Sequence, residues 1–200
     1  MAGWVSFPKA GQHPDESAGV GEPKWRALDG QKAVVYVGID PIVLTHARAL
    51  LTSTSEGATA YVQADIRDTG KVLASAAETL DLSQPVAVMA LMILQYVPDE
   101  DDPWGIVAGL VDALAPGSYL TVSDTVRDID TQRVSEGTAR LNERMGPTRL
   151  TLRSRPEFER FFSGLELAEP GVVPLPEWRG VGSGYPIPCY AGMGREPFSG

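Results

Sequence analysis

The chain has 200 residues, of which 26 are acidic and 17 are basic, and its formal net charge is −9. This length suits one domain with a two- or three-layer core. The negative charge argues against broad contact with nucleic acid or an anionic membrane surface, because both bind clustered Lys and Arg. We therefore expect a small molecule or a protein as the partner.

The chain offers few residues for cross-links or metal binding. Cys189 is the single cysteine, and His13 and His46 are the two histidines, so neither an internal disulfide nor a structural zinc cluster is expected. The four acids at 99–102 precede a predicted helix, where the helix dipole favours negative charge, and we expect no metal there. No apolar run is long enough for a signal sequence or a membrane span, so the expected location is the cytoplasm.

Residues 1–32 differ from the rest of the chain. They are rich in Gly, Pro and polar residues and have neither a helical nor a strand period. This composition predicts an irregular N-terminal arm, which Trp4, Phe7 and Trp25 could pin to the body. The α/β domain is then expected over residues 33–200.

The segment 33–51 predicts a strand, a tight turn and a helix. Its apolar run ends at Asp40, whose carboxylate can accept bonds from the first free amides of a helix. Pro41 suits the first helical position because its missing N–H costs nothing there. Apolar residues then recur at helical spacing and form one stripe: Val43, Leu44, Ala47, Leu50 and Leu51.

Strands and helices alternate from there to the C-terminus. Further strands are predicted at 58–64, 85–94, 118–123, 165–173 and 189–194. Helices are predicted after Asp68, from Pro103 and over 156–162, and another carries Val134, Thr138, Leu141 and Met145 on one face and runs to Gly146. The run 85–94 is apolar at every position, as a central strand covered on both faces requires.

This order predicts a doubly wound, mostly parallel sheet with helices on both faces and an antiparallel C-terminal edge. In such sheets ligands bind above the carboxyl ends of the strands. That rule selects residues 38–40, 65–66, 92–96 and 123–127 as candidate site positions.

With these elements placed, the chain resembles the small S-adenosylmethionine-dependent methyltransferases of the class I, Rossmann-like kind, and among them a bacterial family formerly catalogued as a domain of unknown function. The likeness is carried in order by VVYVGIDPIVLTHARALL, TAYVQADIRD, PVAVMALMILQYVPDEDDPWGIVAGLVDALAPGSYLTVSD and FERFFSGLELAEPGVVPLPEWR. It implies S-adenosylmethionine as cofactor and methyl transfer to a small-molecule acceptor.

The resemblance also implies cofactor contacts at particular positions. A carboxylate that binds the ribose hydroxyls is expected at position 38, but this chain has Gly38, and Asp40 is the nearest acid. Asp65 matches the acid that receives the adenine amino group, and the Ile66 amide would meet a ring nitrogen. Helix capping and turn formation are the simpler alternatives for Asp40 and Asp65.

The segment 92–99 matches the loop after the fourth strand of the family's fold, and it would line the methionine side of the cofactor through Met92 and Gln95. Relatives tend to carry His at position 95, and an amide cannot take a proton as His can, so no catalytic residue is predicted. Arg149, Arg153 and Arg155 form a basic cluster that could meet an anionic acceptor, although charges on a turn are usually only solvated. The candidates for acceptor contact are Tyr96, Asp124, Arg127, Trp178 and Tyr185.

The chain departs from the family pattern upstream. Class I methyltransferases have a strand before the one that ends at Gly38, followed by a glycine-rich turn that approaches the cofactor. Residues 1–32 contain no such motif. The usual first strand is therefore expected to be missing, and the two strands beside the gap could close up or the arm could fill it.

Three functions stay open on the sequence. The first is an active methyltransferase, in which in-line placement supplies most of the rate. The second is a truncated or degenerate relative that acts as a binding or interaction module. The third is an NAD(P)-dependent oxidoreductase, which the absence of G-x-G-x-x-G disfavours.

Overall fold

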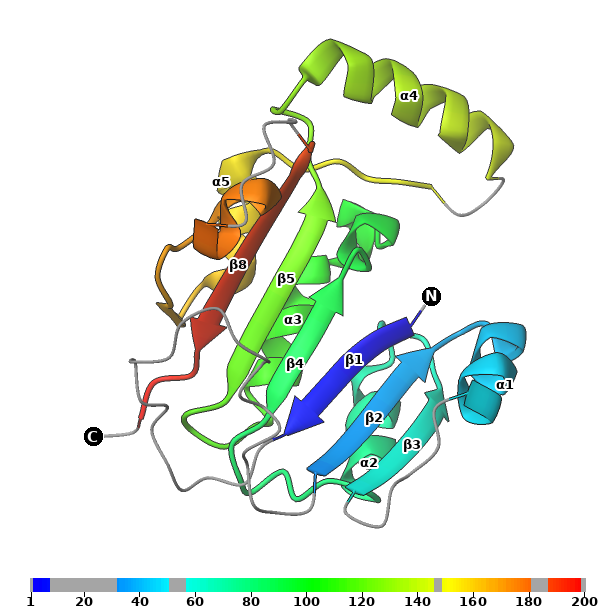
Figure 1. Cartoon of the computed structure of the whole chain (residues 1–200), viewed down its shortest axis with the longest axis vertical. Coiled ribbons are helices and arrows are strands. Elements are labelled where there is room, and N and C mark those ends of the chain that lie inside the picture. The colour runs from blue at the N-terminus through cyan, green and yellow to red at the C-terminus, as the bar shows by residue number, and fades with distance from the viewer. Residues whose placement is uncertain (1, 8–31, 51–56, 146–148, 181–186, 199–200) are drawn as a thin grey trace.

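The structure is a computed structural model that describes residues 2–7, 32–50, 57–145, 149–180 and 187–198. One mixed sheet has the strand order β3-β2-β1-β4-β5-β8-β6, with β7 paired to β8 (Figure 1). The strands are β1 (Ala2–Phe7), β2 (Lys32–Gly38), β3 (Gly57–Gln63), β4 (Ala87–Leu91), β5 (Tyr119–Thr125), β6 (Glu166–Leu167), β7 (Val173–Pro174) and β8 (Cys189–Arg195).

Strand β1 fills the slot between β2 and β4. It is antiparallel to both neighbours, and its residue 5 lies opposite Val35 on one side and Val88 on the other. The prediction of an irregular arm is therefore wrong for Ala2–Phe7, and the arm fills the gap rather than leaving the sheet to close. The reason is physical: both edges of the slot carry unpaired backbone groups, which a strand of either direction can satisfy.

The prediction of a mostly parallel sheet is also wrong. The β2–β3 and β4–β5 pairs are parallel, whereas β1 and the C-terminal strands pair antiparallel with their neighbours. The expected strand at 165–173 is two short strands, β6 and β7, separated by a turn at Gly171 with φ of 82°. The antiparallel C-terminal edge itself is confirmed.

The helices begin where their capping residues predict. Asp40 accepts a bond from Ile42 N at 2.8 Å at the start of α1 (Pro41–Leu50). Asp68 accepts from Lys71 N at 3.0 Å before α2 (Thr69–Ala77), and Asp102 from Gly105 N at 3.1 Å before α3 (Pro103–Val111). The remaining helices are α4 (Thr131–Arg144) and α5 (Arg155–Glu159).

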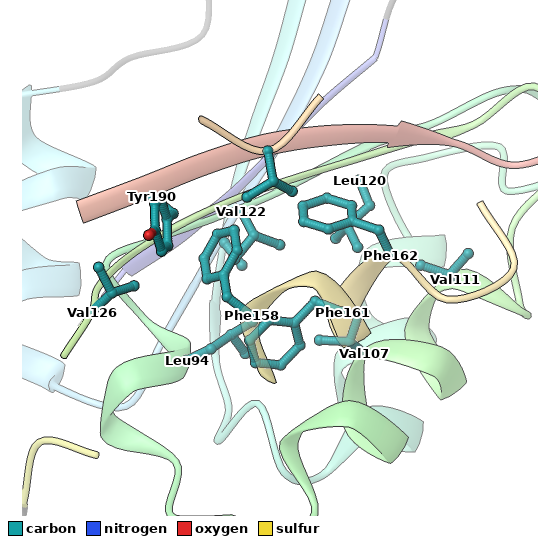
Figure 2. Packing of buried hydrophobic residues seen from close by; sticks show 12 residues of the cluster. Leu94, Val107, Val111, Leu120, Val122, Val126, Phe158, Phe161, Phe162 and Tyr190 are labelled. Atoms are coloured by element: carbon teal, nitrogen blue, oxygen red, sulfur yellow. The ribbon is translucent and has the colours of Figure 1, made fainter. Parts of the chain in front are cut away.

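Two apolar clusters form the core on one face of the sheet. In the first, Val35 and Val37 of β2 pack with residues of α2 and α3. In the second, Leu120 and Val122 of β5 pack with aromatic side chains of α5 and the turn that follows it, namely Phe158, Phe161 and Phe162 (Figure 2). Helices had been predicted on both faces, but those that build these clusters share one face, with α2 and α3 behind the sheet in Figure 1.

The other helices lie outside these clusters. Helix α1 lies at the β3 edge, and α4 extends beyond the carboxyl end of β5, away from the sheet (Figure 1). None of the helices in the described residues is long and apolar enough to cross a membrane.

Candidate functional site

A cavity of about 430 Å³ lies between the sheet and helices α2 and α3. Its rim includes residues at or just beyond the carboxyl ends of β2, β3 and β4, where the strand order predicts a ligand. Gly38, Asp65, Ile66 and Tyr96, all predicted as site residues, line this cavity. The structure therefore brings together predicted residues from three segments that are widely separated in sequence.

Asp65 is held by Arg67. The Asp65 carboxylate accepts bonds from the Arg67 N–H at 3.0 Å, from Nε at 3.0 Å and from Nη2 at 2.6 Å. Arg67 also donates to Asp101 at 2.9 Å. Hydrogen bonding to Arg67 lowers the pKa of Asp65, so this carboxylate is charged at neutral pH. Since a carboxylate offers about four acceptor positions, Asp65 keeps room for a further donor.

The neighbouring backbone supplies a complementary group. The Ile66 N–H has no hydrogen-bond partner within the described part of the chain, so a carboxylate acceptor and a free amide donor stand side by side on the rim. This pair matches the exocyclic amine and the ring nitrogen of adenine. Ile39, half exposed at 47%, adds an apolar surface on the same rim.

The end of β2 offers no carboxylate to the cavity. Gly38 has no side chain, and its carbonyl accepts from Ala64 N at 3.1 Å. Asp40 caps α1 and is not among the residues that line the cavity. The capping alternative for Asp40 is thus what the structure shows.

Met92 and Gln95 do not line the cavity either. Gln95 is buried, and its side-chain oxygen accepts from Thr125 N at 3.0 Å, so it ties the loop after β4 to the end of β5. Met92 has a positive φ of 58°, and its N–H donates to the Ser123 carbonyl at 2.6 Å. These contacts give both residues a role in shaping the loop.

Asp124 is buried beside this loop. Neither carboxylate oxygen of Asp124 has a hydrogen-bond partner among the described residues. Burial raises the pKa of Asp124 to about 8, an effect that the charge of Arg153 only partly offsets. Asp124 therefore carries a proton at neutral pH and does not present a charge to an acceptor.

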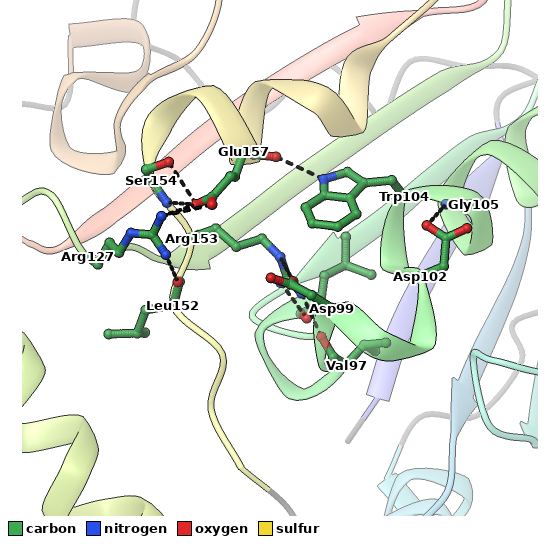
Figure 3. Close-up of polar contacts among 11 residues, drawn as sticks. Val97, Asp99, Asp102, Trp104, Gly105, Arg127, Leu152, Arg153, Ser154 and Glu157 are labelled. Carbon is green, nitrogen blue, oxygen red and sulfur yellow. Dashed lines mark hydrogen bonds and ion pairs between the residues drawn. The ribbon is translucent and has the colours of Figure 1, made fainter.

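Arg153 also binds this loop (Figure 3). This buried guanidinium donates to the carbonyls of Leu94 at 2.9 Å and Val97 at 2.6 Å, and it pairs with Asp99 at 2.9 Å. The centroids of the Trp104 and Phe161 rings lie 5.4 Å from it. The sequence suggested a solvated basic cluster, but this member of it is structural.

The other predicted acceptor residues are not gathered at the cavity. Arg127 is bound by Glu157 at 2.7 Å, and Trp178 lies beside Arg179 at 5.9 Å. Neither lines the cavity. Tyr185 lies outside the described residues.

Arg67 lines the cavity but was not among the predicted site residues, whereas Ile39 falls in the selected range 38–40 and Arg149 belongs to the basic cluster suggested for an anionic acceptor. The nearness of Arg67 to Asp65 in QADIRD was a usable signal, because a cation two residues from an acid can pair with it. Arg149 approaches the cavity through long-range folding, which its local sequence does not reveal. Within the described residues, no group of three or more His, Cys, Asp or Glu side chains could hold a metal ion.

Comparisons with known proteins identify the family. A family model described as S-adenosyl methyltransferase matches residues 26–197. The chain belongs to this family. A DUF574 family protein from Streptomyces avermitilis is 39% identical, with a TM-score of 0.78 over 86% of this chain and 68% of that one. No curated protein sequence matches.

Two further structures are similar to this chain. A protein from Thermobifida fusca described as a candidate methyltransferase is 35% identical, with a TM-score of 0.68 over 82% of this chain and 62% of that one. The present chain thus spans under two thirds of this relative's length. A S-adenosylmethionine-dependent methyltransferase from Methanosarcina mazei, at 13% identity and a TM-score of 0.56, shares the fold alone.

Proposed function

We propose that this member of the S-adenosyl methyltransferase family binds S-adenosylmethionine at the cavity rim and transfers its methyl group to a small-molecule acceptor. The observation that carries the proposal is the Asp65 carboxylate just beyond the carboxyl end of β3, beside the Ile66 N–H, which has no hydrogen-bond partner among the residues that the structure describes. Family membership supplies the cofactor class.

The residues of the chain would divide the work. Asp65 would accept from the adenine amino group while Arg67 holds its carboxylate in place, and the Ile66 N–H would donate to the ring. Ile39 would cover an adenine face. The cofactor supplies an electrophilic methyl on a sulfonium, so the protein need only orient the acceptor and exclude water. Tyr96, half-buried on the rim, is the lining side chain placed to orient an acceptor.

The test is isothermal titration of the chain with S-adenosylmethionine, S-adenosylhomocysteine and adenosine. Asp65→Asn is expected to weaken binding by about 10- to 100-fold, because a hydrogen bond to a charged group contributes about 1.5–3 kcal/mol. Asp101→Asn is the matched control, since Asp101 also pairs with Arg67 but does not line the cavity. Gly38→Asp, which introduces the expected ribose acid, should tighten binding of all three ligands.

Equal affinity in the wild type and Asp65→Asn would reject the assignment of Asp65. An absence of heat and of thermal stabilisation with every ligand would overturn the proposal and favour the second function, a binding module without methyl transfer.

A further inference from the structure

The cavity extends well beyond the part of its rim where an adenine would bind. It continues between the sheet and the helices, past Val72 and Ala76 of α2 and Leu110 of α3. Its far end is lined by Leu80, Leu82, Val86 and Leu114. Among the side chains that the structure describes, the charged ones that line it follow the carboxyl end of a strand or precede α5, so their charge lies at one end: Asp65, Arg67, Glu100 and Arg149.

The walls of the inner part are buried and apolar. Ala76 is 5% exposed, Leu80 6% and Val86 3%. An apolar cavity of about 150 Å³ stays dry and takes up benzene, and this one is about 430 Å³. A void costs stability in proportion to its volume, because the lining atoms lose contacts. A long apolar chain would restore these contacts, whereas water would find no hydrogen-bond partner inside.

The rim carries one cation that is not engaged within the described part of the chain. Arg67 is bound by Asp65 and Asp101, and the nearby Arg153 by Asp99. Arg149 is exposed, lines the cavity and makes no hydrogen bond or ion pair with any described residue. A guanidinium with its donors free binds a carboxylate well. Glu100 also lines the cavity and would repel an anion. We therefore expect Arg149 to be the side chain that binds an anionic group.

We propose that the cavity binds a single-chain amphiphile of the fatty acid class, with the alkyl chain between the sheet and helices α2 and α3 and the carboxylate at Arg149. This site shares the cavity with the adenine contacts at Asp65 and Ile66, but it does not depend on cofactor binding.

The test is titration of the full chain with saturated fatty acids of increasing length, below their micelle concentrations and without S-adenosylmethionine. Saturable binding of one molecule per chain is expected. Affinity should rise about fourfold for each added methylene while the chain still fits, and then stop rising once the cavity is full. Absence of binding, or an affinity that rises without limit, would overturn the proposal.

Variants locate the site. Ala76→Leu adds three carbons inside the cavity and should weaken dodecanoate binding at least about tenfold. Ala77→Leu makes the same change at the next residue of α2, which is exposed, and should leave binding unchanged. Melting temperatures check that both variants fold, and Leu114→Phe blocks the far end if Ala76→Leu does not fold. Equal binding by the two folded alanine variants would reject this location.

The head group is tested by exchange of charge. Arg149→Gln should weaken binding of dodecanoate but not of 1-dodecanol, because the alcohol has no charge to lose. Arg144→Gln, at an exposed position that does not line the cavity, is the control. Equal loss for both ligands would show that Arg149 does not bind the carboxylate, and the proposal would fail in that part.

Discussion

Replacing Arg153 by methionine tests whether hydrogen bonds from this buried cation hold the loop after β4 against the segment that precedes α5. Arg153 is 2% exposed and donates to the carbonyls of Leu94 and Val97, which are 0% and 5% exposed. Methionine keeps most of the side-chain volume and removes all the donors. The Val97 carbonyl would then be buried without a partner among the described residues, whereas the Leu94 carbonyl would still accept from the Val97 N–H at 3.0 Å.

The magnitude follows from the Val97 carbonyl. Leaving a buried polar group unsatisfied costs about 1–3 kcal/mol, so Arg153→Met should lower the free energy of unfolding by about 1–3 kcal/mol. Loss of the ion pair adds little, because the Asp99 side chain is 48% exposed and stays solvated. Arg153→Lys keeps one ammonium and should cost less than Arg153→Met. Asp99→Asn should cost under about 1 kcal/mol.

Urea unfolding, followed by circular dichroism and tryptophan fluorescence, measures this order. The midpoint should shift while the dependence on urea concentration stays the same, which identifies a change of stability rather than of compactness. If Asp99→Asn lowers the free energy of unfolding as much as Arg153→Met does, the ion pair stabilises the loop and the hydrogen bonds to the carbonyls do not. That result would refute the reasoning.

Two other predictions concern pH and packing. Burial raises the pKa of Asp124 from 3.8 to about 8, so between these pH values the native chain keeps a proton that the unfolded chain releases. The free energy of unfolding should therefore fall as the pH rises from 4 to 8, by at most about 1.4 kcal/mol per pH unit. Asp124→Asn should flatten this slope in urea titrations at pH 5 and 7, and an unchanged slope would contradict it. Gly192→Ala would place a Cβ 2.8 Å from Phe162 and should cost about 1–3 kcal/mol. Gly137→Ala in α4, with nothing within 4 Å, should stabilise by about 0.5–1 kcal/mol, and equal thermal shifts for the two glycine variants would contradict the packing argument.

Local signals predicted local structure well. Asp68 and Asp102 cap their helices as expected, because a cap needs only an acid and the amides two or three residues away. The rim positions Asp65 and Ile66 followed from strand ends in the same way. Strand β1 could not be predicted, since its residues have no strand period and its pairing depends on two edges formed by distant segments.

The interior of the site was less predictable for the same reason. Gln95 was expected to face a cofactor, but the Thr125 amide from the next strand binds its side chain. Asp124 was expected to contact an acceptor, but the fold buries it without a partner. The role of Gln95 depends on a contact 30 residues away in sequence, and the role of Asp124 depends on burial. A local sequence pattern reveals neither of them.

The direction of β1 bears on how a cofactor could be held. Parallel strands β2 and β3 present their carboxyl ends at the rim, whereas β1, which is antiparallel to β2, presents its amino end, with Ala2 opposite Gly38. A glycine-rich turn follows the carboxyl end of a first strand, so within the described residues this edge has no place for one. The adenine contacts at Asp65 and Ile66 do not depend on that turn. Contacts to the nucleoside would therefore supply most of the affinity for the cofactor. Comparable affinities for adenosine and S-adenosylmethionine would support this prediction.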